Sequence, residues 1–256
     1  MYSNKAPALS TTSFLLLAVI AMAAAAFYRL PLLDERPMHT DEAILAFKTA
    51  DFQTTGHFNY DPKDYHGPGL HYAALLWSKV AFWGAPDTWH GAQLRTVTAV
   101  CGLLLILATL LLSDALGRGG VVAAMLLAAV SPMQVYYSRY YIMETPLVLL
   151  VMIALVSFWR YSQGGGRLWL LLGGIATGLQ HATKETFILN VAAGFVAWFV
   201  AKQLFGPFEP RRSGFSMGSS RQRPGKPWLW VLIPAAVVSV AMYSGGFHDW
   251  EAVKNS

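Results

Sequence analysis

Four short polar clusters contain the residue types that acid–base and phosphate chemistry require. The first is Met38-His39-Thr40-Asp41-Glu42. Its adjacent acids can supply one general base and one partner for a metal ion or a hydrogen bond. Alternatively, Thr40 is a helix N-cap and the acids lie at the positive end of the helix dipole. A capping box on that cap would need Glu or Gln at position 43, where the chain has Ala43.

The second cluster spans residues 61–72 and contains His66, Gly67-Pro68-Gly69 and Tyr72. An imidazole with carboxylates nearby can bind a divalent cation such as Zn²⁺ or Mg²⁺. We therefore consider a metal site formed by His66 with one or more of Asp41, Glu42 and Glu144. The alternative is a polar turn leading into an interfacial helix, because proline and glycine form turns.

The third cluster spans residues 138–146 and contains Arg139 and Glu144. The guanidinium of Arg139 is a planar fork that suits phosphate. Thr145 and Pro146 predict a helix start, with Thr145 as N-cap and Pro146 at the first helical position. In the alternative interpretation Glu144 only complements the helix dipole, and a surface Arg–Glu pair contributes little to stability.

The fourth cluster spans residues 180–186 and contains Lys184. A lysine ammonium group can bind a phosphate as a point charge. Alternatively, Lys184 extends from the end of a helix toward the membrane surface, with its apolar stem buried.

The elements that position these clusters are predicted to be membrane helices. Of the 256 residues, 55% are hydrophobic and 13% charged, whereas about a quarter of the residues in a soluble domain are charged. The apolar residues lie in blocks long enough to cross a bilayer, which takes about 20 residues. We predict one all-α module over residues 1–256, a polytopic membrane helix bundle with about seven spans, at 11–30, 91–112, 119–136, 146–160, 167–183, 186–203 and 228–244.

The long segment 31–90 separates the first two spans and is predicted to form an outer loop with interfacial helices. Its apolar run 69–83 has about 15 residues, fewer than a span needs. If it does not cross, ten basic residues and two acids lie on the cytoplasmic side, as the positive-inside rule favours. This topology places the N-terminus and a basic linker at 205–227 in the cytoplasm, and the chain in the cell membrane. The first apolar block is expected to be retained rather than cleaved as a signal peptide.

In this topology all seven histidines and twelve of the fourteen acids lie on the outer side, so the four clusters can converge there. The net charge of +5 does not indicate nucleic-acid binding, because the basic residues lie between spans, where topology explains them. The single cysteine, Cys101, excludes a disulfide within the chain.

The order and spacing of these motifs resemble the GT-C membrane glycosyltransferases that use polyprenyl-phosphate sugars. The resemblance rests on Asp41-Glu42, His66-Gly67-Pro68-Gly69-Leu70, the run 139–146, and Gly174-x-x-x-Gly178 followed by Thr183-Lys184. It covers about residues 15–250 and includes the protein O-mannosyltransferases and the lipid A aminoarabinose transferases. The chain is most similar to the prokaryotic flippase activity-associated proteins. Such enzymes continue well beyond a seventh span, so the chain is expected to be an N-terminal part.

The resemblance implies a role for several residues. Asp41 matches the proposed catalytic base, Glu42 the acid that follows it, and Glu144 the acid before the fourth span. In the aminoarabinose transferases a metal-binding Glu and a Lys occupy the places of His66 and Gly67.

We therefore predict a glycosyltransferase that moves a sugar from a polyprenyl-phosphate donor, anchored among membrane lipids, to an acceptor of unknown class. Asp41 would deprotonate the acceptor hydroxyl. Arg139, Lys184 or a metal would stabilise the departing phosphate, with Tyr72 as a further substrate-binding residue. Two alternatives are an inactive truncated scaffold and a flippase or transporter component for lipid-linked sugars. A transporter would place charges near the bilayer midplane, whereas these spans are nearly free of charge there.

Overall fold

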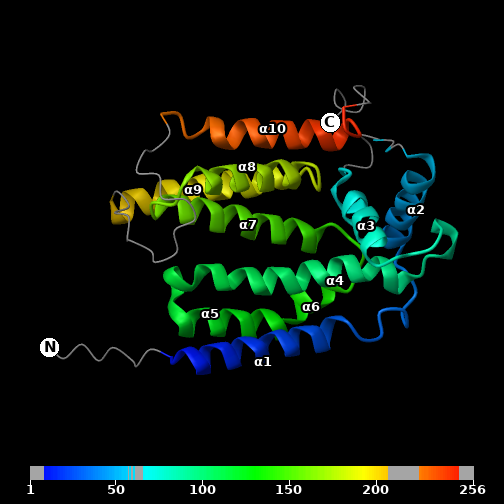
Figure 1. Ribbon diagram of the computed structural model, residues 1–256, viewed down its shortest axis with the longest axis horizontal. Coiled ribbons are helices and arrows are strands. Elements are labelled where there is room, and N and C mark those ends of the chain that lie inside the picture. The colour runs from blue at the N-terminus through cyan, green and yellow to red at the C-terminus, as the bar shows by residue number, and fades with distance from the viewer. Residues whose placement is uncertain (1–8, 57, 59, 61–65, 207–224, 248–256) are drawn as a thin grey trace.

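The computed structural model describes residues 9–56, 58, 60, 66–206 and 225–247 and arranges them as a bundle of long helices (Figure 1). In chain order the helices are α1 (Thr11–Arg29), α2 (Thr40–Thr55), α3 (Gly69–Val80), the 3₁₀ helix η2 (Pro86–Thr88), α4 (Gly91–Ala108), the 3₁₀ helix η3 (Thr109–Leu112), α5 (Ser113–Val130), α6 (Pro132–Ser138), α7 (Glu144–Ser162), α8 (Arg167–His181), α9 (Phe187–Phe205) and α10 (Leu229–Tyr243). No β-strand forms within these residues. An isolated antiparallel β-bridge joins His66 to Lys184. The predicted all-α membrane bundle is confirmed.

Each of the seven predicted spans lies on helical structure. Four helical stretches of the described chain have the length and apolar composition needed to cross a membrane: Thr11–Arg29, Gly91–Val130, Glu144–Ser162 and Phe187–Leu204. The stretch Gly91–Val130 makes two passes, because the backbone leaves the helical conformation at Gly117, where φ is 71°. Helices α8 and α10 are shorter, with 15 residues each. The start of α1 and the end of α10 lie at opposite ends of the bundle (Figure 1).

The third predicted span, 119–136, is not one continuous helix. Ser131 leaves the helical region at φ −58° and ψ 118°, and the short α6 begins at Pro132. Proline has no N–H for the helical ladder and disfavours the helical conformation of the residue before it. The break turns the end of this segment, with its tyrosines, away from the direction of α5.

Small residues bring the first helix against the rest of the bundle. Ala18, Ala21 and Ala25 are buried on one face of α1, in a cluster with residues of α4 and α5. At the end of α1, the buried Arg29 donates hydrogen bonds to the carbonyl oxygens of Ala128 and Ala129. These are carbonyl groups in the last turn of α5, which lack partners within the helix. This packing makes α1 part of the bundle.

The contact between α8 and α10 depends on Gly174 and Gly178. A β-carbon at Gly174 would lie 2.5 Å from the carbonyl oxygen of Val231, and one at Gly178 would lie 2.5 Å from that of Ala235. Two glycines four residues apart let membrane helices approach backbone to backbone. The predicted motif is therefore an internal helix–helix contact, and it holds the C-terminal half of α8 in place.

The helices of the first long loop, α2 and α3, lie across one end of the bundle, at a steep angle to the long helices (Figure 1). The apolar run 69–83 forms the 12-residue α3, as expected for a segment too short to span. Buried apolar residues fix both helices to α4 and to the turn before α7: Leu45, Leu70, Ala74, Leu94, Val97, Tyr141 and Met143. Most of the predicted basic linker 205–227 lies outside the described residues.

Candidate active site

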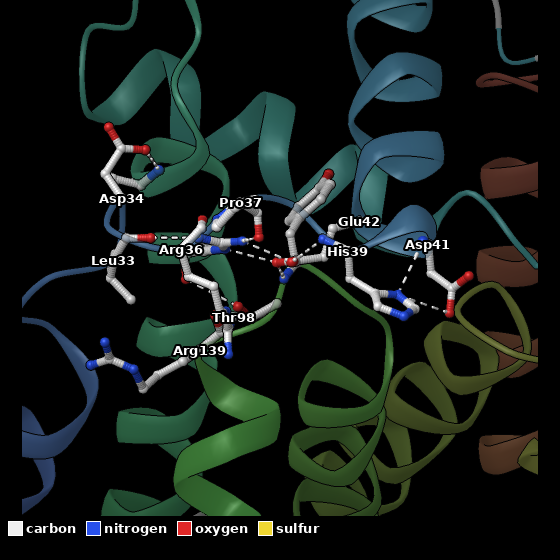
Figure 2. Close-up of polar contacts among 12 residues, drawn as sticks. Leu33, Asp34, Arg36, Pro37, His39, Asp41, Glu42, Thr98 and Arg139 are labelled. Carbon is white, nitrogen blue, oxygen red and sulfur yellow. Dashed lines mark hydrogen bonds and ion pairs between the residues drawn. The ribbon is translucent and has the colours of Figure 1, made fainter.

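The two adjacent acids of the first cluster have opposite environments. Glu42 is fully buried and its carboxylate accepts two hydrogen bonds from Arg95, both at 2.8 Å. The backbone N–H groups of Tyr141 and His39 donate to the same carboxylate, at 2.8 and 3.1 Å. Figure 2 shows this carboxylate at the centre of the network, with Asp41 on one side of it and Arg139 on the other. Glu42 thus joins α2, α4 and the turn before α7.

The charge state of Glu42 follows from these contacts. Burial by itself raises the pKa of Glu42, but the hydrogen bonds from Arg95, Tyr141 and His39 outweigh burial and lower the pKa overall. The carboxylate is therefore ionised at neutral pH and neutralises Arg95, which lies inside a predicted span. An arginine there is costly without a partner, and this cost was the sequence signal that could have singled out Arg95.

Helix α2 begins one residue earlier than the Thr40 cap proposed from the sequence, and that proposal is wrong. His39 is the N-cap, and its Nδ1 accepts a hydrogen bond from the backbone N–H of Asp41. Glu42 then occupies the third helical position and completes the capping box through the N–H of His39. Asp41 lies in the first turn with its side chain 72% exposed. The cap therefore buries Glu42 and leaves the side chain of Asp41 exposed.

A cavity of about 300 Å³ opens beside Asp41. It is lined by His39, Asp41, Leu45, His66, Tyr136, Tyr137, Tyr140, Ile142, Met143, Glu144 and Lys184. Four predicted site residues, Asp41, His66, Glu144 and Lys184, therefore reach one space from four separate segments of the chain. The convergence that the topology predicted is present in the fold.

Within this cavity Lys184 and Glu144 form an ion pair. The ammonium of Lys184 donates to Oε1 of Glu144 at 2.8 Å, and the two side chains are 20% and 37% exposed. Glu144 therefore pairs with Lys184. The alternative interpretation had paired Glu144 with Arg139. Glu144 is also the first residue of α7, whose N-cap is Met143, so the N-cap predicted at Thr145 is wrong. Pro146 still lies in the first turn, where backbone N–H groups have no partner within the helix.

The glycines beside His66 allow its loop to approach the turn after α8. The N–H of Gly69 donates to the carbonyl oxygen of Ala182 at 2.6 Å, and His66 pairs with Lys184 in the bridge. A β-carbon at Gly67 would lie 2.3 Å from the same Ala182 oxygen. Any other residue there would push the loop away, so Gly67 is required by packing. The bridge brings His66 and Lys184 to the same cavity.

Arg139 and Tyr72 do not line this cavity. The guanidinium of Arg139 donates to the carbonyl oxygens of Tyr28 and Leu32, at 3.0 and 3.2 Å. Tyr72 packs edge to face against Phe52, with ring centroids 5.0 Å apart, and partial burial raises its pKa. In this structure both residues support the surrounding framework, and their predicted roles in substrate binding stay predictions.

Sequence reasoning did not single out the aromatic residues of the cavity. Tyr136, Tyr137 and Tyr140 come from α6 and the turn that follows it, and His39 comes from the cap of α2. The signal was the concentration of aromatic side chains in the run Tyr136-Tyr137-Ser138-Arg139-Tyr140 next to a predicted site residue. The three tyrosines reach the cavity because Pro132 breaks the third predicted span.

A buried polar network fixes the two loop helices behind the site. The hydroxyl of Thr49 in α2 lies 2.7 Å from Nδ1 of His71 in α3 and 2.8 Å from the hydroxyl of Tyr141. Burial lowers the pKa of His71 to about 3, so this histidine is neutral at physiological pH. His71 is therefore a structural residue of the framework.

The carboxylates predicted to bind a metal together with His66 contact histidine or basic side chains among the described residues. No three His, Cys, Asp or Glu side chains gather to hold a metal ion in the part of the chain that the structure describes. Glu42 and Glu144 each hold a basic side chain instead. Asp61 and Asp64 of the second cluster lie outside the described residues. Metal binding by His66 stays a prediction, and no step below depends on it.

Comparison with known proteins agrees with this fold. Residues 72–247 match the family described as dolichyl-phosphate-mannose-protein mannosyltransferase. No curated protein matches the chain significantly. Among solved structures, the chain resembles the S. cerevisiae protein O-mannosyltransferase Pmt1-Pmt2 complex bound to the sugar donor, with a TM-score of 0.67 and 18% identity.

That structural match covers 96% of this chain and 35% of the yeast chain. It shows the GT-C membrane fold that the motifs predicted, over a part of the larger protein. The particular similarity to flippase activity-associated proteins stays a prediction. The family match extends over more than half of the residues, from the beginning of α3 to the end of α10. The chain therefore belongs to the dolichyl-phosphate-mannose-protein mannosyltransferase family.

Proposed function

We propose that the chain transfers a sugar from a polyprenyl-phosphate donor to an acceptor hydroxyl on the non-cytoplasmic side of the cell membrane. The observation that carries this proposal is the cavity where Asp41, Glu144 and Lys184 converge. It combines an exposed carboxylate with a paired cation, at the end of the bundle where α2 and α3 lie (Figure 1). Family membership supports the donor class, because the family description names dolichyl-phosphate mannose.

In the proposed mechanism Asp41 removes the proton from the acceptor hydroxyl. Its side chain is exposed to the cavity and lies in the first turn of α2, at the positive end of the helix dipole. The acceptor oxygen then attacks the anomeric carbon in line, and the bond between that carbon and the phosphate oxygen breaks. The proton remains on Asp41, and the polyprenyl phosphate leaves with the bonding electrons.

Lys184 is the cation placed to stabilise the departing phosphate. Its ammonium lies at the cavity, 2.8 Å from Glu144, and preorganised positive charge at the leaving group lowers the barrier. Glu144 holds the ammonium in position between reaction cycles. Arg139 belongs to a different pocket, with Arg36 and Arg95, so we assign the phosphate to Lys184 first.

The acceptor class and the orientation are part of the same proposal. The family description names a protein acceptor, so we propose a protein hydroxyl. The excess of basic residues in the segments that the sequence assigns to the cytoplasmic side favours a cytoplasmic N-terminus. The site then faces the non-cytoplasmic side, and the polyprenyl tail lies among the membrane lipids.

The substitution Asp41→Asn tests the base. Asn has nearly the same shape as Asp but no basicity, and base catalysis contributes about 10²–10⁴-fold, so transfer should fall by that factor. The assay follows sugar transfer from polyprenyl-phosphate mannose to a serine- and threonine-rich peptide in membranes containing the full chain. Asp51→Asn is the matched control, because Asp51 lies on the same helix and does not line the cavity.

Two results would contradict the proposal. Undiminished transfer in Asp41→Asn would remove Asp41 as the base. Movement of the lipid-linked sugar across the bilayer without any transfer by the wild type would favour the flippase alternative instead.

A further inference from the structure

Three tyrosines form one wall of the cavity that contains Asp41. Tyr136 and Tyr137 come from α6, and Tyr140 comes from the turn before α7. The rings of Tyr136 and Tyr140 have centroids 4.4 Å apart, and those of Tyr136 and Tyr137 are edge to face at 5.4 Å. We call this set the tyrosine wall.

Contacts with residues outside the cavity hold the tyrosine wall in place. The guanidinium of Arg36 lies over the ring of Tyr140, 3.7 Å from its centroid. Such a cation–π contact restricts the ring it covers. The break at Pro132 and the hydrogen bond from the N–H of Arg139 to the carbonyl oxygen of Tyr136 fix the backbone that carries the rings. The wall is therefore preorganised rather than a set of independent surface side chains.

The wall nevertheless leaves aromatic surface uncovered. Tyr136 is 51% exposed and Tyr137 is 36% exposed, while both line a cavity that also contains Asp41 and Glu144. Tyrosines at a membrane surface commonly form an aromatic belt, and Tyr28, 47% exposed at the end of α1, fits that description. Unlike Tyr28, the tyrosine wall lines the same cavity as the carboxylates of Asp41 and Glu144, which a belt does not require.

A cavity lined by both aromatic rings and carboxylates suits the surface of a sugar ring. The C–H groups of a sugar pack against aromatic faces, whose edges and hydroxyl groups supply polar contacts, and carboxylates accept hydrogen bonds from its hydroxyl groups. A volume of about 300 Å³ lies at the small end of ligand sites, as suits a single ring.

We propose that the tyrosine wall is the subsite for the hexose ring of the donor, and that Tyr136 and Tyr137 supply its binding surface. This inference rests on the proposed function and adds the residues that recognise the sugar itself, apart from the phosphate and the lipid. Contact with the wall holds the ring so that its anomeric carbon faces Asp41.

The test compares two lipids that differ only in the sugar. Binding of a C15 polyprenyl-phosphate mannose and of the same polyprenyl phosphate without sugar is measured on the full chain in nanodiscs. Aromatic contacts of this kind contribute about three- to tenfold in affinity, so Tyr136→Ala and Tyr137→Ala should each weaken binding of the mannose lipid by that factor. Binding of the sugar-free lipid should not change.

Matched variants separate the subsite from a membrane belt and from misfolding. Tyr28→Ala removes an exposed tyrosine at the same end of the bundle outside the cavity, and it should leave both affinities unchanged. Tyr137→Phe keeps the ring and should retain most of the mannose-lipid affinity. Retained affinity for the mannose lipid in Tyr137→Phe would show that the affinity lost in Tyr137→Ala comes from the ring rather than from unfolding.

Each other outcome overturns the inference in a recognisable way. Equal weakening for both lipids would show that the rings hold the lipid tail or the phosphate. Unchanged binding in the alanine variants, with the wild type still preferring the mannose lipid, would refute the wall while leaving the proposed function intact. A wild type that binds neither lipid would refute the proposed function and the subsite together.

Discussion

Asp41 and Glu42 are neighbours in the chain, yet helix geometry directs them to different tasks. Successive residues of an α-helix point about 100° apart, so one side chain enters the core while the other stays at the surface. Glu42 meets Arg95 in the core, and Asp41 meets the cavity. The catalytic role predicted for Glu42 has not been tested, and we assign it the role of positioning the helix that carries Asp41.

This assignment predicts that Glu42→Gln lowers stability more than it affects chemistry. Breaking a buried ion pair from one side leaves the other charge without a partner, which costs about 3–5 kcal/mol. The thermal unfolding midpoint in detergent should fall clearly, and Glu42→Gln/Arg95→Met, which removes both charges, should recover part of the loss. An unchanged midpoint in Glu42→Gln would contradict the positioning role.

The pH dependence of stability gives a second measurement on the same variant. Because contacts in the fold lower the pKa of Glu42, its stabilisation is complete above the unfolded value of about 4.3. It is lost as the pH falls below that value through the folded pKa, since the unfolded state then binds the proton more readily. The wild type should lose stability over this range, and Glu42→Gln should lose less.

At the scale of elements, close packing of α8 on α10 sets the position of the turn that carries Lys184. The hydroxyl of Tyr243 in α10 also donates to the carbonyl oxygen of His181 at 3.2 Å. By contrast, α9 has no buried residue among those described in it, so it packs far less closely on the bundle. The site therefore depends on the approach of α8 to α10 rather than on α9.

We predict that Gly178→Ala destabilises the protein although alanine favours helices. Its β-carbon would lie 2.5 Å from the backbone oxygen of Ala235, so α10 must shift and overpacking of this kind costs about 1–3 kcal/mol. Gly194→Ala in α9 is the matched control. A β-carbon there meets nothing within 4 Å, and the change should be neutral or stabilising, by up to about 1 kcal/mol. Equal unfolding midpoints in the two variants would contradict the packing argument.

At the scale of the molecule, α2 and α3 lie at one end of the bundle and the C-terminal ends of α7 and α9 lie at the other (Figure 1). The cavity is lined by residues of α2 and of the N-terminal end of α7. This separation is what the charge distribution of the sequence predicts for the two sides of a membrane. The orientation itself stays a prediction that labelling can test.

Single cysteines in a Cys101→Ser background give that test. Gln53 at the end of α2 and Gln203 at the end of α9 both have exposed side chains, which makes them better labelling sites than Gly56, whose φ of 70° strains other residues. An impermeant thiol reagent applied to intact cells should label position 53 and leave position 203 unlabelled until the membrane is permeabilised. The reverse pattern would overturn the topology and, with it, the proposed side of catalysis.

Hydropathy and charge along the sequence are enough to predict the membrane bundle and the set of residues available at one end of it. Blocks of apolar residues have to leave water, and the cost of burying charge in lipid places the polar clusters outside the spans. These forces act on any arrangement of the helices, so hydropathy and charge were sufficient to predict the spans, the short α3 and the shared side of Asp41, His66, Glu144 and Lys184.

Which of these residues contact one another depends on the packing of the folded chain. With His39 as the N-cap of α2, Glu42 is buried against Arg95 and Asp41 is exposed. The break at Pro132 places three tyrosines along the cavity. Arg139 instead bound carbonyl groups of α1 and the segment that follows it. Hydropathy has no information on such pairings, because they depend on how each side chain satisfies its hydrogen bonds among neighbours distant in the chain.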